Sequence, residues 1–268
     1  NCCDGSKRSA PALHKVAKTH SSCVEQPIQR LFFALSAHMG YKCYAGDAKD
    51  AYAHSPADFQ VPTYVSIDDA YAEWYYNRHG KRIDRNMVLP VLQALQGHPE
   101  SGRCWEAHIN KILSMKDLGF ESTTHDKCIY KTTYKGHKIL LLRQVDDFAL
   151  ASPNEDIAKE IYDKIGNYLK LPTETEQPFK YLGLMTEFNG VDVAQYDQSI
   201  AISVHNYIDR IMKTHNWTTP AENEKTKPGS PLPTDCISQL YSEDGYEEGS
   251  NEHREMETNQ GFGYRQLL

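Results

Sequence analysis

Residues 139–151 read ILLLRQVDDFALA, two apolar segments joined by Asp146 and Asp147. Short apolar runs rich in branched side chains are typical of buried β-strands. The first segment runs into the acidic pair and the second leads away from it. The pattern therefore predicts a hairpin of two buried strands with both carboxylates at its tip.

Hairpins and helical patterns alternate along the rest of the chain. Residues 135–136 (Lys-Gly) and 189–190 (Asn-Gly) are turn pairs typical of hairpins, and residues 152–155 form a capping box that predicts a helix start. We expect helices near 27–39, 105–119, 153–168 and 208–212, and strands near 41–46, 128–134, 138–145, 179–188, 191–194 and 200–204. Residues 53–90 read as irregular. This pattern predicts an α+β fold, an antiparallel sheet backed on one face by the first and third of these helices.

The composition is that of an ordinary globular protein. Of 268 residues, 40% are hydrophobic and 24% are charged, close to the average for soluble domains. No apolar run approaches the roughly 18 residues of a membrane helix, and the polar first residues carry no secretory signal. The missing initiator Met leads us to expect a fragment of a polyprotein.

The cysteines and histidines give no metal signal. The seven cysteines are scattered, without CxxC pairs or Cys/His clusters at zinc spacing, so structural zinc is not expected. The 12 histidines are dispersed and read as surface or core residues. Reduced thiols fit an intracellular protein, and we expect a cytoplasmic location.

The formal net charge of −7 argues against a general nucleic-acid binder, which should be basic. The charge is unevenly distributed, however. Residues 221–268 carry 4 Lys/Arg and 10 Asp/Glu, a net of −6, which leaves a net of −1 for residues 1–220. The acidity therefore belongs mostly to the C-terminal segment, and the objection is weakened without being removed.

A third carboxylate, Asp47, ends the predicted strand at 41–46. Polymerases use two Mg²⁺ ions about 4 Å apart to activate the attacking hydroxyl and to clamp the transferred phosphate. Because Mg²⁺ prefers oxygen ligands and keeps several waters, two or three carboxylates on rigid strand ends suffice. Asp47 beside Asp146 and Asp147 would supply them. The alternative is a solvated turn, in which Asp is common, and the acidic pair alone does not decide between the two.

Six segments, in order, resemble the reverse transcriptase domain of copia-type retrotransposons. They are QRLFFALSA (29–37), GDAKDAY (46–52), LQGHPESGRCW (95–105), HDKCIY (125–130), LRQVDD (142–147) and FKYLG (179–183). The resemblance covers residues 10–220 and returns at 263–267, GYRQL. Six features in the family's order are much more specific than any one of them.

The resemblance implies RNA-directed DNA synthesis with Mg²⁺, or alternatively Mn²⁺, and deoxynucleoside triphosphates on a primed RNA or DNA template. Asp47, Asp146 and Asp147 would be catalytic and bind two metal ions, with the Ala48 carbonyl as a further ligand. Tyr52 would stack under the incoming sugar and reject a 2′-hydroxyl, or would instead plug the core. The other implied nucleotide contacts are Ala48, Lys49, Asp50, Pro99, Glu100, Ser101 and Gly102, and the implied primer contacts are Gln144, Tyr181, Leu182 and Gly183. Trp105 is assigned to packing, since its helix needs a large apolar anchor.

The resemblance also implies a domain layout. The family's palm would span 27–190, with fingers elements at 53–102. Residues 1–26 would be a remnant of the fingers, 191–220 the start of a thumb-like region and 221–268 an acidic flexible linker. Integrase and RNase H would belong to the same polyprotein, in the cytoplasm, a virus-like particle or the nucleus.

Two residues depart from the family's pattern. Gln144 stands where an aromatic residue is usual, which would loosen contact with the primer end. Glu100 stands where Gln is usual, close to the implied triphosphate, and should weaken nucleotide binding unless it is protonated or paired.

Two other functions stay open. A catalytically silent palm-derived module would fold and bind a partner; the lack of the family's basic fingers segment favours it, whereas three intact acids oppose it. A two-metal nuclease would use similar carboxylates, but Tyr52 and residues 99–102 would then have no role.

Overall fold

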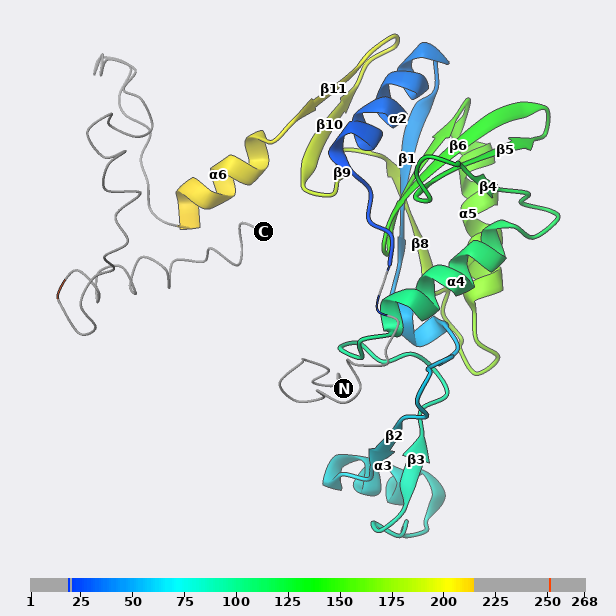
Figure 1. Ribbon diagram of the computed structural model, residues 1–268, viewed down its shortest axis with the longest axis vertical. Helices are drawn as coiled ribbons and strands as arrows, with labels where there is room; N and C mark the ends of the chain where they lie inside the picture. The colour runs from blue at the N-terminus through cyan, green and yellow to red at the C-terminus, as the bar shows by residue number, and fades with distance from the viewer. Residues whose placement is uncertain (1–18, 20, 215–250, 252–268) are drawn as a thin grey trace. The chain divides into compact units, whose positions relative to one another are not determined.

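Six antiparallel strands in the order β4-β5-β6-β7-β1-β8 form the main sheet of the computed structural model (Figure 1). The structure describes residue 19, residues 21–214 and residue 251. The strands are β1 (Lys42–Ala48), β4 (Glu121–Ser122), β5 (Ile129–Tyr134), β6 (His137–Gln144), β7 (Asp147–Ser152) and β8 (Phe179–Leu184). The first of them in the chain, β1, lies between β7 and β8. The antiparallel α+β prediction is confirmed.

The chain divides into two units, residues 1–213 and 214–268, and the first holds the elements described below. The predicted linker at 221–268 lies outside the described residues except at position 251, and most of the predicted fingers remnant at 1–26 lies outside them as well. None of the helices within the described part of the chain combines the length and the apolarity that a bilayer crossing requires.

Two successive hairpins build the centre of the sheet, as predicted. The first closes at Lys135 and Gly136, whose φ angles of 48° and 81° suit a two-residue turn with both central residues left-handed. The second closes between Gln144 and Asp147, which lie opposite each other. The acidic pair therefore lies at the end of the β6–β7 hairpin.

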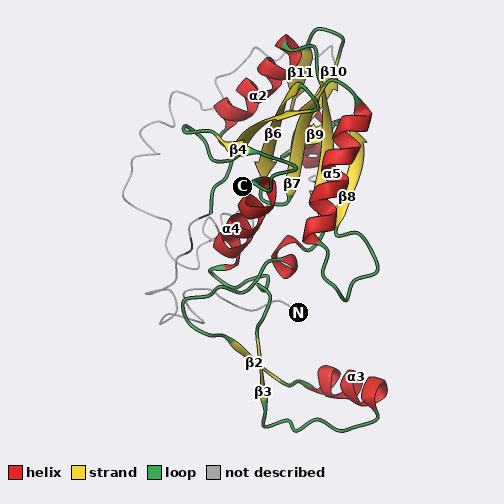
Figure 2. Ribbon diagram, turned by 90° about the vertical axis from the view of Figure 1, so that its right-hand side faces the viewer, coloured by secondary structure: helices red, strands yellow, loops and turns green. Residues whose placement is uncertain are grey.

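Each face of the sheet has its own core, because side chains alternate across a strand. On one face, α4 (Ser101–Leu113) and α5 (Glu155–Leu169) cover Leu141 and Leu150. On the other, α2 (Gln26–His38) covers Leu142 and Ala149, and Figure 2 shows α2 and α5 on opposite sides of the sheet. The prediction that both backing helices cover one face is wrong. Apolar residues at successive positions of β6 and β7 mark strands that are buried on both faces.

Residues 53–90 are more regular than predicted. They contain the end of η1 (Ala51–His54), β2 (Tyr64–Ser66), α3 (Asp69–His79) and β3 (Val88–Pro90). α3 has no buried residue, so no apolar stripe marks it in the sequence. Local signals hold its ends: the Asp68 side chain accepts a hydrogen bond from the Tyr71 amide, and Gly80 ends the helix with φ of 65°.

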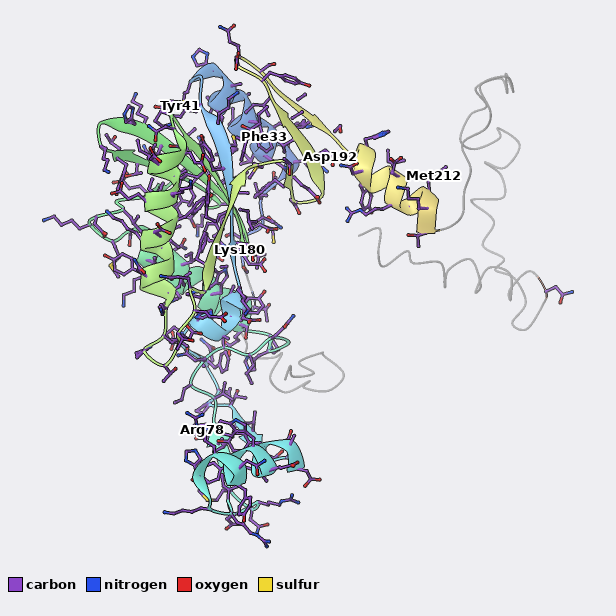
Figure 3. The ribbon with its side chains drawn as sticks, turned by 180° about the vertical axis from the view of Figure 1, so that it is seen from behind. Phe33, Tyr41, Arg78, Lys180, Asp192 and Met212 are labelled. Carbon is purple, nitrogen blue, oxygen red and sulfur yellow. The ribbon has the colours of Figure 1, made fainter. Side chains whose placement is uncertain are left out.

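A second, three-stranded sheet follows β8. Its strands are β9 (Glu187–Phe188), β10 (Val191–Gln195) and β11 (Ile200–Ser203). The predicted strand at 179–188 is therefore two strands, because β8 pairs with β1 whereas β9 pairs with β10. Asp192 accepts hydrogen bonds from the backbone and side chain of Asn206, 3.0 and 2.6 Å long, at the start of α6 (His205–Thr214; Figure 3).

Gly46 in β1 permits close packing directly beneath the acidic residues. A Cβ atom at this position would come within 2.6 Å of the Phe179 ring and 2.9 Å of the Tyr162 ring. Gly46→Ala is therefore expected to lower the free energy of unfolding by about 1–3 kcal/mol, the usual cost of overpacking a core, measured by denaturant titration. The double variant with Phe179→Leu, which removes the ring, should lose less free energy of unfolding than the sum of the losses in the two single variants. A denaturation midpoint of Gly46→Ala equal to that of the wild type would show that β1 can shift freely to accommodate the added methyl group.

Candidate active site

Asp47, Asp146 and Asp147 lie where β1 passes the end of the β6–β7 hairpin. Asp47 lies directly opposite Asp147 in the β1–β7 register, so their side chains leave the same face of the sheet. The Ala48 amide donates a 2.9 Å hydrogen bond to the Asp146 carbonyl, which ties the turn to the end of β1. Acids that are distant in the sequence are thus neighbours in the fold.

Burial and neighbouring negative charges raise the proton affinity of Asp147 and Asp47. Desolvation, followed by the charges of Asp146, Asp47 and Glu187, raises the pKa of Asp147 to about 6, although the residue is exposed. Desolvation and the charge of Asp146 also raise the pKa of Asp47, against the opposing effect of Lys180. Like charges held together by the backbone favour either protonation or a bound cation.

Lys180 is a neighbour that the sequence reasoning missed. In the β1–β8 register it lies opposite Asp47, so Asp47 has a carboxylate on one side and an ammonium group on the other. Figure 3 labels Lys180 on β8. Its place depends on which strands pair and in which register, and no local motif carries that information.

The chemistry of the donor set fits Mg²⁺, which takes carboxylate oxygens and retains several waters. The strand register supplies the backbone arrangement. Within the described residues, however, no three or more His, Cys, Asp and Glu side chains converge closely enough to hold a metal ion. The backbone therefore places the three carboxylates in one region, and side-chain rotation would have to complete a metal site.

A cavity of about 520 Å³ opens beside Asp146, within the usual size range of small-molecule sites. Tyr52 lines it, and desolvation followed by the charge of Asp146 raises the pKa of the Tyr52 phenol. The half-buried Tyr52 ring also packs against the main core. The complete lining is Asp50, Ala51, Tyr52, Ala53, His54, Ala94, Leu95, Gln96, Val145, Asp146 and Glu174.

A family model described as reverse transcriptase (RNA-dependent DNA polymerase) matches residues 8–229. The chain belongs to this reverse transcriptase family. The match spans every motif discussed above except residues 263–267. No curated protein and no solved structure gives a match.

Of the predicted nucleotide contacts in this reverse transcriptase domain, Asp50 and Tyr52 line the cavity at Asp146. Ala48 is buried at the end of β1, and Lys49 lines a separate cavity of about 260 Å³. Residues 99–102 are not part of the lining at Asp146, whereas residues 94–96 are. The assignment of residues 99–102 to nucleotide contacts stays a prediction.

Glu100 and Ser101 are buried inside the reverse transcriptase domain. The Glu100 carboxylate accepts a 3.0 Å hydrogen bond from the backbone amide of Gln60 and lies 3.4 Å from the Arg103 guanidinium. The predicted departure at this position is thus resolved as a paired internal carboxylate. Ser101 Oγ donates to the Leu95 carbonyl at 2.6 Å.

The predicted primer contacts of the reverse transcriptase lie in three different places. Leu182 lines a cavity of about 340 Å³ together with Asp147, next to Gly183, whose φ is 87°. Tyr181 lies on the α5 side instead, where its hydroxyl donates a 3.0 Å hydrogen bond to Glu155. Desolvation, followed by this hydrogen bond, raises the pKa of the Tyr181 phenol. Gln144 is half-buried, and its Oε1 accepts a 2.8 Å hydrogen bond from the Val24 amide.

Proposed function

We propose that this chain is an RNA-directed DNA polymerase of the copia-type retrotransposon class, which extends a primer with deoxynucleoside triphosphates and two Mg²⁺ ions. The observation that carries the proposal is the register of Asp47 with Asp147, with Asp146 tied to the end of the same strand. Membership of the reverse transcriptase family supports the same reaction class.

The three acids would hold the metal ions, and the ions would lower the pKa of the primer 3′-hydroxyl and neutralise the transferred phosphate. Asp146 borders the 520 Å³ cavity and Asp147 the 340 Å³ cavity. We assign the first cavity to the incoming nucleotide and the second to the primer end. The hairpin tip then lies between the two reacting groups, and catalysis rests on positioning and charge neutralisation.

Primer extension on poly(rA)·oligo(dT) with Mg²⁺ and dTTP tests the proposal on the full chain. The expected result is lengthening of the primer that requires both the metal and dTTP. Shortening of the strands without dTTP would indicate the nuclease function. Binding of the duplex with no change in strand length would indicate the silent module.

The raised pKa of Asp147 predicts how metal and pH act on stability. Its folded-state pKa of about 6 lies above the ordinary value of about 3.9. The group therefore contributes stability that is present below the ordinary value and is lost as the pH rises through 6. Because a cation offsets the charge, Mg²⁺ should raise the melting temperature clearly at pH 7.5 and little at pH 5.

Thermal melts with and without Mg²⁺ at the two pH values measure this effect, and Asp147→Asn is the variant to compare. The variant should melt at a higher temperature than the wild type at pH 7.5 without metal, because one repelling charge is gone. Equal Mg²⁺ shifts at both pH values would contradict the role of Asp147 in binding the ion.

A further inference from the structure

The turn of the β6–β7 hairpin contains a strained residue. Val145 has a φ of 54°, in the left-handed region that β-branched side chains rarely adopt. Such a conformation persists where surrounding contacts determine it. Because Asp146 and Asp147 follow directly, whatever holds the Val145 peptide also sets the position of the acids.

Two side chains from different elements meet at the Val145 carbonyl. The Trp105 indole Nε1–H of α4 donates a 2.7 Å hydrogen bond to it, and Arg143 Nη1 donates a longer one of 3.4 Å. Trp105 and Arg143 are both fully buried. The next carbonyl along the chain, that of Asp146, accepts from the Ala48 amide, so both peptides of the turn are fixed.

Burial of the Arg143 guanidinium at this position carries a desolvation penalty. Among the residues that the structure describes, its Nε and Nη2 atoms find no hydrogen-bond partner, and its ion-pair partner, Glu106 on α4, lies 4.0 Å away. Glu106 is itself held by Ser22, whose amide and hydroxyl donate to the carboxylate at 2.9 and 2.7 Å. Buried ion pairs add little stability over an apolar replacement. The Arg143–Glu106 pair is therefore explained better by the orientation it gives to the Val145 carbonyl than by a gain in fold stability.

We propose that Trp105 and Arg143, with Glu106 as the partner of Arg143, are positioning residues that hold the Val145 peptide and so fix the acidic pair at the end of β1. The consequence for catalysis rests on the proposed function. The contact itself can be tested without nucleotide or metal. Neither Trp105 nor Glu106 lines the two cavities beside the acids, so their loss should lower the rate at saturating nucleotide and leave the KM for nucleotide almost unchanged.

A double-mutant cycle of Trp105→Phe and Val145→Gly isolates this role. Phe keeps the ring in the core but lacks the N–H donor, and Gly adopts a positive φ at no cost. Hydrogen exchange of the Ala48 amide reports whether the turn stays against β1. Trp105→Phe should speed this exchange roughly 10-fold in the wild-type background and less than about 3-fold in the Val145→Gly background, because coupled residues are not additive.

The Leu150 amide, in the centre of the sheet, is the control for global opening. Exchange at Ala48 that accelerates only as much as at Leu150, or effects that are additive in the cycle, would overturn the proposal. The paired change Arg143→Met with Glu106→Gln, which removes both charges together, should also speed exchange at Ala48 more than at Leu150.

Primer extension gives the second measurement. Trp105→Phe is expected to lower kcat about 10-fold and to change the KM for dTTP less than about 2-fold. A rise in KM with unchanged kcat would overturn the positioning role. If the wild-type chain incorporates no nucleotide, the polymerase assignment fails, while the exchange cycle still decides whether these residues hold the hairpin.

Discussion

Asp146→Asn is expected to reduce primer extension at least about 1000-fold, the scale on which removing an essential catalytic group acts. The amide has the shape of the carboxylate but lacks the negative charge that a divalent cation requires. Asp146 is the acid that borders the proposed nucleotide cavity, and it acts electrostatically on both Asp47 and Tyr52. Asp47→Asn should have a comparable effect, measured as initial rates on poly(rA)·oligo(dT).

Asp163→Asn is the matched control for these variants. Asp163 is an exposed acid on α5, on the helix that covers the face away from Asp47 and Asp147. The primer-extension rate of Asp163→Asn should stay within about 2-fold of the wild-type rate, as for other exposed surface changes. Retention of wild-type incorporation by Asp146→Asn would remove the catalytic assignment of the hairpin.

Tyr52→Val should reduce discrimination against ribonucleotides by roughly 100-fold, the scale on which pocket shape separates substrates. The Tyr52 ring lies at the wall of the 520 Å³ cavity beside Asp146, and its removal opens space where a 2′-hydroxyl would otherwise clash. The ratio of kcat/KM for dCTP to that for CTP on poly(rG)·oligo(dC) measures the effect. Tyr52→Phe, which keeps the ring, should leave the ratio unchanged.

The same variants separate the two interpretations of Tyr52. A residue that only plugs the core would make Tyr52→Val less stable without altering the dCTP-to-CTP ratio. Because the ring contacts both the core and the cavity, we expect a lower melting temperature together with the altered ratio. An unchanged ratio would restrict Tyr52 to packing.

The parts of the fold that local chemistry determines could be predicted from the sequence. Gly136, Asn189 and Gly190 adopt the positive φ angles that their residue types favour, so both hairpins can be predicted. The cap at the start of α5 was also recognised, although the side chain that accepts the hydrogen bond is that of Asn154. Asp47 and the acidic pair lie at strand ends, as the apolar runs beside them predict.

The parts that depend on non-local pairing could not be predicted. The position of Lys180 beside Asp47 follows from the β1–β8 register, and the hydrogen bond from the Gln60 backbone amide to Glu100 follows from how a loop packs on α4. The hydrogen bond from Trp105 to the Val145 carbonyl likewise joins a helix to a turn that is remote in sequence. Each of these contacts forms only once the tertiary fold is in place.

The most direct test of the central claim is anomalous diffraction from Mn²⁺ in crystals of the chain with a dideoxy-terminated primer–template and the next deoxynucleoside triphosphate. The account predicts two Mn²⁺ ions about 4 Å apart, bound by carboxylate oxygens of Asp47 and Asp146 at the end of β1. Manganese sites elsewhere in the molecule, with these side chains binding no ion, would contradict it.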